Sequence, residues 1–212
     1  MKARLQVLPT NLNLSIWYPN NHNSFCLHQG QQQIIESMAH ILNGCQFYKG
    51  LFIARHDRIV NIIMQTVRPI SHTATFYCNK AVNPSMFELS NNVSPFDNVT
   101  ANIPDGIRID EAHREVVMLE VGYTFDSSLE EAFNTKQLKY QPLVQAITQL
   151  GYNCQLVIFI FGSLGHVHRL VVRGLRILGL TKCRAKQLAK YCSISSIIGS
   201  RCIWRRRCYL YP

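Results

Sequence analysis

The middle of the chain, residues 103–150, has the clearest pattern of hydrophobic and polar positions. It predicts a short strand that opens at Pro104-Asp105, a turn, a longer apolar strand that ends at Glu120, and then an amphipathic helix. Because side chains alternate along a strand, the longer strand has two distinct faces. One face carries Val116, Met118, Glu120 and Gly122, and the other carries Val117, Leu119, Val121 and Tyr123. The Glu120 carboxylate therefore lies on a face otherwise suited to burial.

The helix that follows has an apolar stripe and an opposite polar face. At about one hundred degrees per residue, the stripe consists of Leu129, Ala132, Phe133, Tyr140, Leu143, Ile147 and Leu150. The polar face consists of Glu130, Asn134, Gln137, Gln141 and Gln145. Lys136 falls near the middle of the stripe and Lys139 at its edge, so a lysine should point at the sheet.

Two carboxylates should meet where the paired strands begin and end. Asp105 lies at the mouth of the first strand and can reach Glu120 across the hairpin. An unpaired charge in an apolar layer costs several kcal/mol, so Glu120 requires a cationic partner. A pair of carboxylates suits a hard divalent ion, above all magnesium, which takes few protein oxygens and keeps several waters.

Further periodic segments flank this region. They are a helix from Ala54 that ends before Pro69, a strand within Thr73–Val82, a loop over Asn83–Asn102, a strand over Asn153–Phe161, and helices over Val167–Leu178 and Leu180–Tyr191. The continuous apolar run of the strand over Asn153–Phe161 is typical of a central strand that is buried on both faces. Together these elements predict a mixed α/β domain.

Charge and composition indicate a polyanion binder with one good core. Of the 212 residues, 47% are hydrophobic, and the length of the chain is short for two full domains. The net charge is +10. No acidic residue follows Glu131, whereas cations crowd the end of the chain. The expected nucleic-acid-binding residues are Lys182, Arg184, Lys186, Lys190, Arg201, Arg205, Arg206 and Arg207.

The chain has no predicted secretory or membrane segment. No charged and then apolar leader opens it, and its longest apolar run, Leu156 to Phe161, is too short to cross a bilayer. An intracellular location without a membrane partner is expected. The eight cysteines are then reduced thiols, core residues or metal ligands rather than a disulfide framework.

The motifs of the middle region resemble those of the PD-(D/E)xK nucleases. The P-D, the Glu-ended strand and the run E-V-x6-S-L-E-E-A-x3-K-x2-K-Y-x-P-L look like one branch of them, the restriction-like endonuclease at the carboxyl end of site-specific non-LTR retrotransposon polyproteins. The resemblance implies Asp105 and Glu120 as metal ligands and a lysine as the third catalytic group. The usual E-x-K lysine position is Gly122 here, so Lys136 or Lys139 on the helix would replace it.

An amino-terminal segment resembles the zinc knuckle that precedes this nuclease. The family pattern is C-x2-C followed by H-x4-C, and Cys26, His40 and Cys45 match it. The second cysteine is Gln29, so His28 is a substitute ligand that would complete the set Cys26, His28, His40 and Cys45. The alternative is a decayed knuckle without zinc, held by apolar residues of a short helix from Ile34 and packed on the nuclease domain.

The resemblance also extends to the flanks. The residues R-H-D-R open the helix before the catalytic hairpin, so His56 would either lie near the site or serve as a helix cap or surface group. The end of the chain is similar to the family's closing helix, where Trp204 covers the core or stacks on a base. The implied parts are a linker over 1–24, the knuckle over 25–50, a PD-(D/E)xK core over 54–180 and a basic helical tail over 181–212.

The expected function is metal-dependent nicking of DNA in the nucleus. Asp105 and Glu120 would hold Mg2+ or Mn2+, a helix lysine would stabilise charge on the phosphate, and Asp110 is a weaker candidate ligand. The partners would be DNA, element RNA and the upstream reverse transcriptase of the polyprotein, which would use the nick as a primer. The rival expectation is a decayed copy that binds nucleic acid without cutting it, and a purely structural domain fits the charge poorly.

Overall fold

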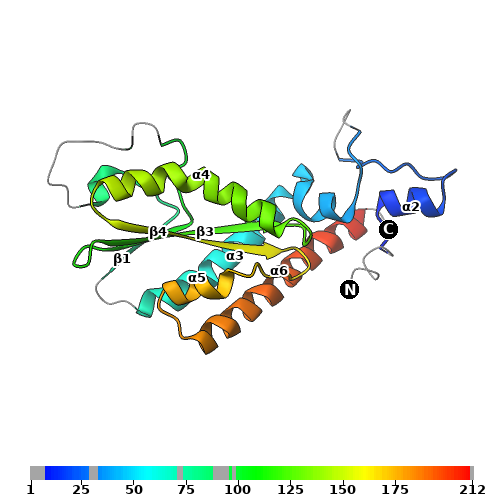
Figure 1. Ribbon diagram of the computed structural model, residues 1–212. Coiled ribbons are helices and arrows are strands. Elements are labelled where there is room, and N and C mark those ends of the chain that lie inside the picture. The colour runs from blue at the N-terminus through cyan, green and yellow to red at the C-terminus, as the bar shows by residue number, and fades with distance from the viewer. Residues whose placement is uncertain (1–7, 29–32, 71–73, 88–95, 97–98, 211–212) are drawn as a thin grey trace. The chain divides into compact units, whose positions relative to one another are not determined.

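A computed structural model describes residues 8–28, 33–70, 74–87, 96 and 99–210 (Figure 1). The opening residues 1–7 and the position of Gln29 lie outside the described residues. The chain divides into two compact units, one formed by His56–Ser196 and the other by Met1–Arg55 with Ile197–Pro212. The tail predicted over 181–212 is thus shared between the units.

The larger unit contains a four-stranded sheet, so the mixed α/β class is confirmed. Its strands are β1 (Thr75–Cys78), β2 (Gly106–Asp110), β3 (Glu115–Thr124) and β4 (Asn153–Gly162), in the order β1-β2-β3-β4. The first three strands are antiparallel neighbours, and β4 runs parallel to β3. A helical crossover is the connection that a parallel pair requires, and α4 (Leu129–Gln149) provides it.

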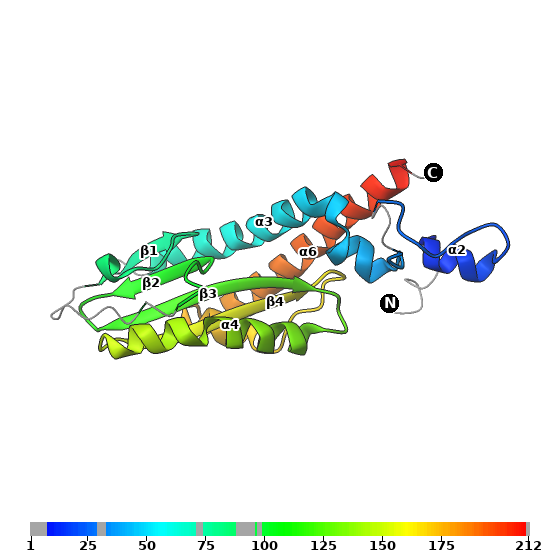
Figure 2. The same ribbon diagram turned by 90° about the horizontal axis from the view of Figure 1, so that it is seen from above.

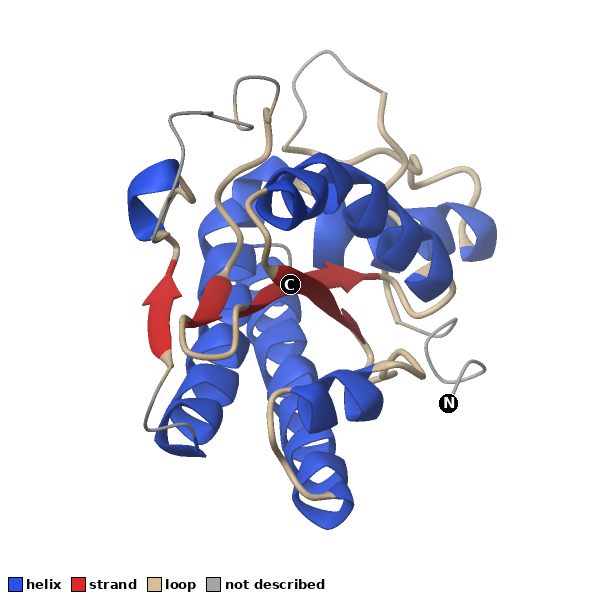
Figure 3. Ribbon diagram, turned by 60° about the vertical axis from the view of Figure 1, so that its left-hand side comes forward, coloured by secondary structure: helices blue, strands red, loops and turns tan. Residues whose placement is uncertain are grey.

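Helices cover both faces of the sheet (Figures 2 and 3). Val117, Leu119 and Val121 pack with residues of α3 (Lys49–Val67), α5 (Val171–Ile177) and α6 (Lys182–Leu210). Val116 and Met118 pack on the other face with residues of α4. The alternation predicted for the long strand is therefore confirmed.

Several predicted boundaries were wrong. The strand β3 continues four residues beyond Glu120 because its far end pairs with β4 through Thr124 and Gly162. The helix α3 begins at Lys49 rather than Ala54. The strand β4 was predicted to be a central strand, but it is the outer strand of the sheet. Its last residues are nevertheless buried, because helices cover its faces.

The end of the chain is one helix, α6, where two were predicted. Residues 192–200, which lie between the two predicted helices, are helical within α6. In the larger unit, the Ser196 hydroxyl donates to the carbonyl oxygen of Gly162 over 2.7 Å. In the smaller unit, a Cβ at Gly199 would come within 2.6 Å of the Arg55 side chain.

The smaller unit is held by polar side chains as well as by apolar ones. Its helices are α2 (Asn11–Trp17), a π-helix over His40–Gly44 and a 3-10 helix over Gln46–Tyr48. Residues 34–36 are extended, and Ile35 forms an antiparallel bridge with Phe25, so the short helix predicted from Ile34 begins only at Met38. Two further 3-10 turns, Arg68–Ile70 and Pro84–Met86, belong to the larger unit.

Two buried arginines organise the smaller unit. The Arg55 guanidinium donates to Ser200 Oγ at 2.8 Å and to the Leu42 carbonyl oxygen at 3.0 Å. Arg207 donates to Glu36 Oε1 at 3.0 Å and to Asn11 Oδ1 at 3.1 Å. Buried charges require such partners, so both arginines are structural residues of this unit.

None of the helices in the described part of the chain combines the length and apolar character that crossing a bilayer requires.

Candidate active site and candidate metal centre

The two carboxylates predicted to meet do lie side by side in the larger unit. Gly106 pairs with Leu119, which puts Asp105 opposite Glu120. The Asp105 backbone N–H donates to Glu120 Oε2 over 3.4 Å, and the Val121 N–H donates to Asp105 Oδ2 over 2.7 Å. The side chain of Glu120 is 3% exposed and that of Asp105 is 13% exposed. Backbone groups of the hairpin therefore hold both carboxylates at the edge of the core.

The helix α4 brings Lys136 to this pair of carboxylates. Its Nζ forms an ion pair with Glu120 Oε1, and the lysine side chain remains 30% exposed. Lys139 lies one turn further along, is exposed, and donates to the hydroxyl oxygen of Tyr140 at 3.1 Å. Of the two lysines that the sequence left open, Lys136 is the one that contacts a candidate metal ligand.

Gly122 explains why the strand itself carries no lysine. A Cβ built at Gly122 would lie 2.6 Å from Ile160 Cδ1 and 3.5 Å from Lys136 Cε. The space that a Cβ at position 122 would need is thus taken by Ile160, and the aliphatic chain of Lys136 would be in ordinary van der Waals contact with it. The glycine on the strand and the lysine on the helix are two parts of one arrangement.

Two more side chains join the site. Tyr140 is buried, and its hydroxyl donates to the Ile103 carbonyl oxygen at 2.9 Å. Burial, and then the charge of Glu120, raise the pKa of Tyr140 well above its ordinary value. The sequence pattern placed Tyr140 in the apolar stripe and missed this role, although its position one turn after Lys136 is a usable signal.

His56 contacts the other carboxylate. Its Nε2 lies 3.2 Å from Asp105 Oδ2, and its Nδ1 lies 3.1 Å from Asp57 Oδ1. The hydrogen bond with Asp105, which outweighs burial, raises the pKa of His56 to about 9. At neutral pH the imidazole is therefore a cation, and Lys136 and His56 together balance the charges of Glu120 and Asp105.

Because of the contact between His56 and Asp105, we expect the free energy of unfolding to decrease at alkaline pH. The folded chain holds the His56 proton up to about pH 9, whereas the ordinary pKa is 6.5. The stabilisation from this contact is fully present below the ordinary pKa of histidine and is lost as the pH rises through about 9. Denaturant unfolding of the parent and of a His56→Gln variant should show a gap in unfolding free energy near pH 6.5 that shrinks above pH 9. An equal gap at both pH values would contradict it.

Asp110 lies away from this site. It pairs with Glu115 at the opposite end of β2, and its Oδ1 accepts from the His113 backbone N–H at 3.2 Å and lies 3.0 Å from His113 Nδ1. These contacts lower the pKa of Asp110. Its role is that of a turn residue, so the structure does not bring it to the other candidate ligands.

Three metal-ligating side chains converge in the smaller unit. Ligand atoms of Cys26, His40 and Cys45 all lie within 4.8 Å of one another. The two Sγ atoms are 3.7 Å apart, and two thiolates bound to one tetrahedral zinc at about 2.3 Å would lie about 3.8 Å apart. His40 Nε2 is buried and has no hydrogen-bond partner among the described residues. A metal ion at the centre of the three side chains would bind both sulfur atoms and give the His40 ring a partner.

His28 is not part of this group. Its ring stacks on Phe47 with centroids 3.9 Å apart, and its Nε2 lies 3.4 Å from the Tyr48 hydroxyl. Burial lowers the pKa of His28. Among the described residues, the ligand set predicted as Cys26, His28, His40 and Cys45 therefore reduces to three members.

The predicted basic residues separate into exposed and buried ones. Exposed are Lys182, Arg184, Lys186, Lys190, Arg201, Arg205 and Arg206. Arg207 was wrongly assigned to the nucleic-acid surface, because it is 4% exposed and pairs with Glu36. Trp204 is half-buried, with its ring under the Arg207 guanidinium at 5.7 Å.

Neither a scan against protein-family models nor a search of the curated proteins finds a match for this chain.

Proposed function

We propose that the chain is a metal-dependent DNA endonuclease of the PD-(D/E)xK type. The observation that carries the proposal is the contact of the Lys136 ammonium with Glu120, beside Asp105, at the end of the β2–β3 hairpin. An Asp, a Glu and a Lys in contact form the set that the motifs imply. They come from the residue before β2, from β3 and from α4, so their convergence is not a consequence of sequence proximity.

Each residue of the site has a task in phosphodiester hydrolysis. Asp105 and Glu120 would hold magnesium or manganese, which supplies a bound water of lowered pKa and offsets phosphate charge. Lys136 would donate to a phosphate oxygen as negative charge develops there. The N–H of Val121 fixes the orientation of Asp105 from the backbone, and Tyr140 fills the buried space beside Glu120.

The charge distribution supports DNA as the substrate. The net charge is +10, and seven of the eight predicted basic residues at the end of the chain are exposed. Such cations bind phosphates and release counterions. We take the chain to be the carboxyl-terminal part of a retrotransposon polyprotein, in which a nick in the nuclear target DNA would serve the reverse transcriptase as primer.

Nicking of supercoiled plasmid tests this proposal. The parent chain with magnesium or manganese should convert the plasmid to the open circular form, and an Asp105→Ala variant that still shifts DNA in a gel should not. Silence of both chains, with DNA binding intact, would favour a decayed copy that only binds nucleic acid. Equal nicking by both chains would assign the activity to another site.

We further propose that Cys26, His40 and Cys45 bind zinc. Burial raises the pKa of the Cys26 thiol to about 11, so metal binding must release its proton. Cobalt(II) titration of the parent should give a thiolate charge-transfer band and raise the melting temperature. The Cys45→Ala variant should lose the band, and Cys202→Ala, at an exposed position, should retain it. A band that survives Cys45→Ala would rule out this ligand set.

A further inference from the structure

The outer edge of β4 is only partly used by the chain itself. Near its end, the His168 N–H donates to the Ile160 carbonyl oxygen at 3.0 Å, and the Gly162 N–H donates to the His166 carbonyl oxygen at 2.7 Å. Residues 166–168 thus begin an antiparallel partner for β4, with Phe161 bridged to Val167. The chain then leaves the edge and enters α5.

Earlier along β4 the same edge remains open. The N–H and C=O groups of every second residue point to the same side of a strand, so those of Leu156 and Ile158 point outward with those of Ile160. Within the described part of the chain, no backbone hydrogen bond joins Leu156 or Ile158 to a segment on this side. The row of free donors and acceptors matches a further strand.

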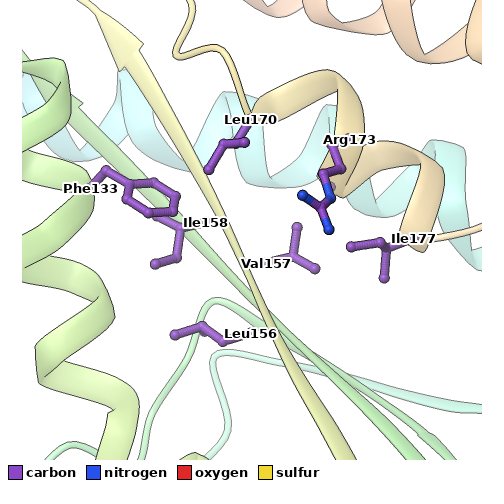
Figure 4. Close-up of a pocket in the computed structure, with 8 residues that line it drawn as sticks. Phe133, Leu156, Val157, Ile158, Leu170, Arg173 and Ile177 are labelled. Carbon is purple, nitrogen blue, oxygen red and sulfur yellow. The ribbon is translucent and has the colours of Figure 1, made fainter.

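A groove of about 210 Å³ follows this open edge between α4 and α5 (Figure 4). Its lining residues are Phe133, Leu156, Val157, Ile158, Leu170, Arg173, Gly174 and Ile177. Pockets for small molecules are usually larger, about 300–1,000 Å³. The groove therefore suits one or two apolar side chains of an extended segment better than a small ligand.

The walls of the groove are firmly held. Gly174 brings α5 so close to the strand that a Cβ there would lie 2.3 Å from Val157 Cγ1. On the other side, the Phe133 ring stacks on His168 with centroids 4.6 Å apart, and His168 in turn bonds Glu130 at 3.0 Å. The groove is thus preformed, which reduces the ordering cost of binding.

The charge of the groove is positive. Arg173 is exposed and extends from α5 toward the strand (Figure 4). None of the lining residues is acidic, and the nearby Glu130 already pairs with His168 and Arg169. A second copy of the chain, docked edge to edge, would oppose arginine to arginine. The complementary occupant is a segment that carries carboxylates.

We propose that this groove binds an extended acidic peptide of another protein, which adds to the edge of β4 as a strand. Its backbone pairs with Leu156 and Ile158, its apolar side chains enter between Phe133 and Ile177, and a carboxylate meets Arg173. Strand addition of this kind draws affinity from backbone hydrogen bonds and specificity from alternate side chains. It is independent of the proposed nuclease activity.

Amide NMR with defined peptides tests the proposal. The probes are a set of short peptides that alternate valine or leucine with aspartate or glutamate, and a matched set with lysine in the acidic positions. The acidic set should shift the amide signals of Leu156 and Ile158 and protect them from exchange, whereas the lysine set should not. No effect from any acidic peptide at millimolar concentration would overturn the proposal.

Three variants separate strand addition from general charge attraction. Leu156→Pro removes one outward N–H, which a sheet edge tolerates, and should weaken the acidic peptide at least tenfold. Arg173→Glu should do the same and admit the lysine peptide, while Arg176→Glu, an equal charge change outside the groove, should have little effect. Equal losses of peptide affinity in both arginine variants, with no loss in Leu156→Pro, would refute a peptide site. A dimer of the parent chain that Leu156→Pro dissociates would refute it as well.

Discussion

Replacement of Lys136 by methionine is expected to lower metal-dependent nicking by about 10²–10³-fold, the usual loss when one charge-stabilising donor is removed. The ammonium of Lys136 contacts Glu120 beside Asp105, so under the proposed mechanism its loss would remove a cation that stabilises the developing phosphate charge. Initial rates of nicking at saturating magnesium measure the effect. Binding of the plasmid should be almost unchanged, because one cation among many is removed.

Lys139→Met is the matched control for this experiment. It removes the same functional group from the same helix, one turn away, where the lysine donates to Tyr140 and not to a carboxylate. This variant should keep most of the parent's rate. A large loss in Lys139→Met with an active Lys136→Met would exchange the roles of the two lysines, and full activity in both would remove the helix from the mechanism.

The second large effect concerns stability. Arg207→Met should lower the unfolding free energy of the smaller unit by about 3–5 kcal/mol, the usual cost of leaving one member of a buried ion pair alone. Glu36 is 1% exposed and would lose its charged partner, with the Asn11 N–H as a remaining donor. Denaturant unfolding, followed by hydrogen exchange at the residues of this unit, measures the change.

An adjacent arginine and a double variant make this result specific. Arg206→Met removes the same charge from an exposed position of α6 and should change the unfolding free energy by about 0.5 kcal/mol or less. Arg207→Met combined with Glu36→Gln should recover part of the loss, because no buried charge is left unpaired. Losses that simply add would show that Arg207 stabilises by packing alone.

The elements of the larger unit follow closely from local patterns. The alternation of side chains along residues 115–124 depends on one strand only, and the apolar stripe of α4 depends on one helix only. The buried faces of β3 and α4 could therefore be predicted from the sequence. The edge position of β4 could not, because an apolar strand covered by helices has the same composition in any position of the sheet.

The buried arginines lay beyond sequence reasoning for a similar reason. Arg207 belongs to a run of three arginines, and its partner Glu36 is 171 residues away. A run of cations normally marks a solvated surface, and only the packing of α6 decides which of its members turns inward. The structural role of Arg55, which precedes His56 of the candidate site, likewise could not be predicted from the sequence.

The choice between the two lysines also required the structure. Lys136 and Lys139 are three residues apart, which separates them by only about 60° around a helix. Either can face the sheet, depending on how the helix is rotated. The packing of Leu143, Ile147 and Tyr140 against the sheet fixes that rotation and directs Lys136 to Glu120.

The close packing of Gly122, Ile160 and Lys136 also bears on related chains. A Cβ at residue 122 would lie 2.6 Å from Ile160 Cδ1 and in ordinary van der Waals contact with Lys136 Cε, 3.5 Å away, so a bulky residue on the strand would compete with the helix lysine for the same space. A small residue two positions after the glutamate should therefore accompany a lysine sixteen positions after it. A search pattern that requires E-x-K passes over such chains, and one that requires this paired substitution would retrieve them.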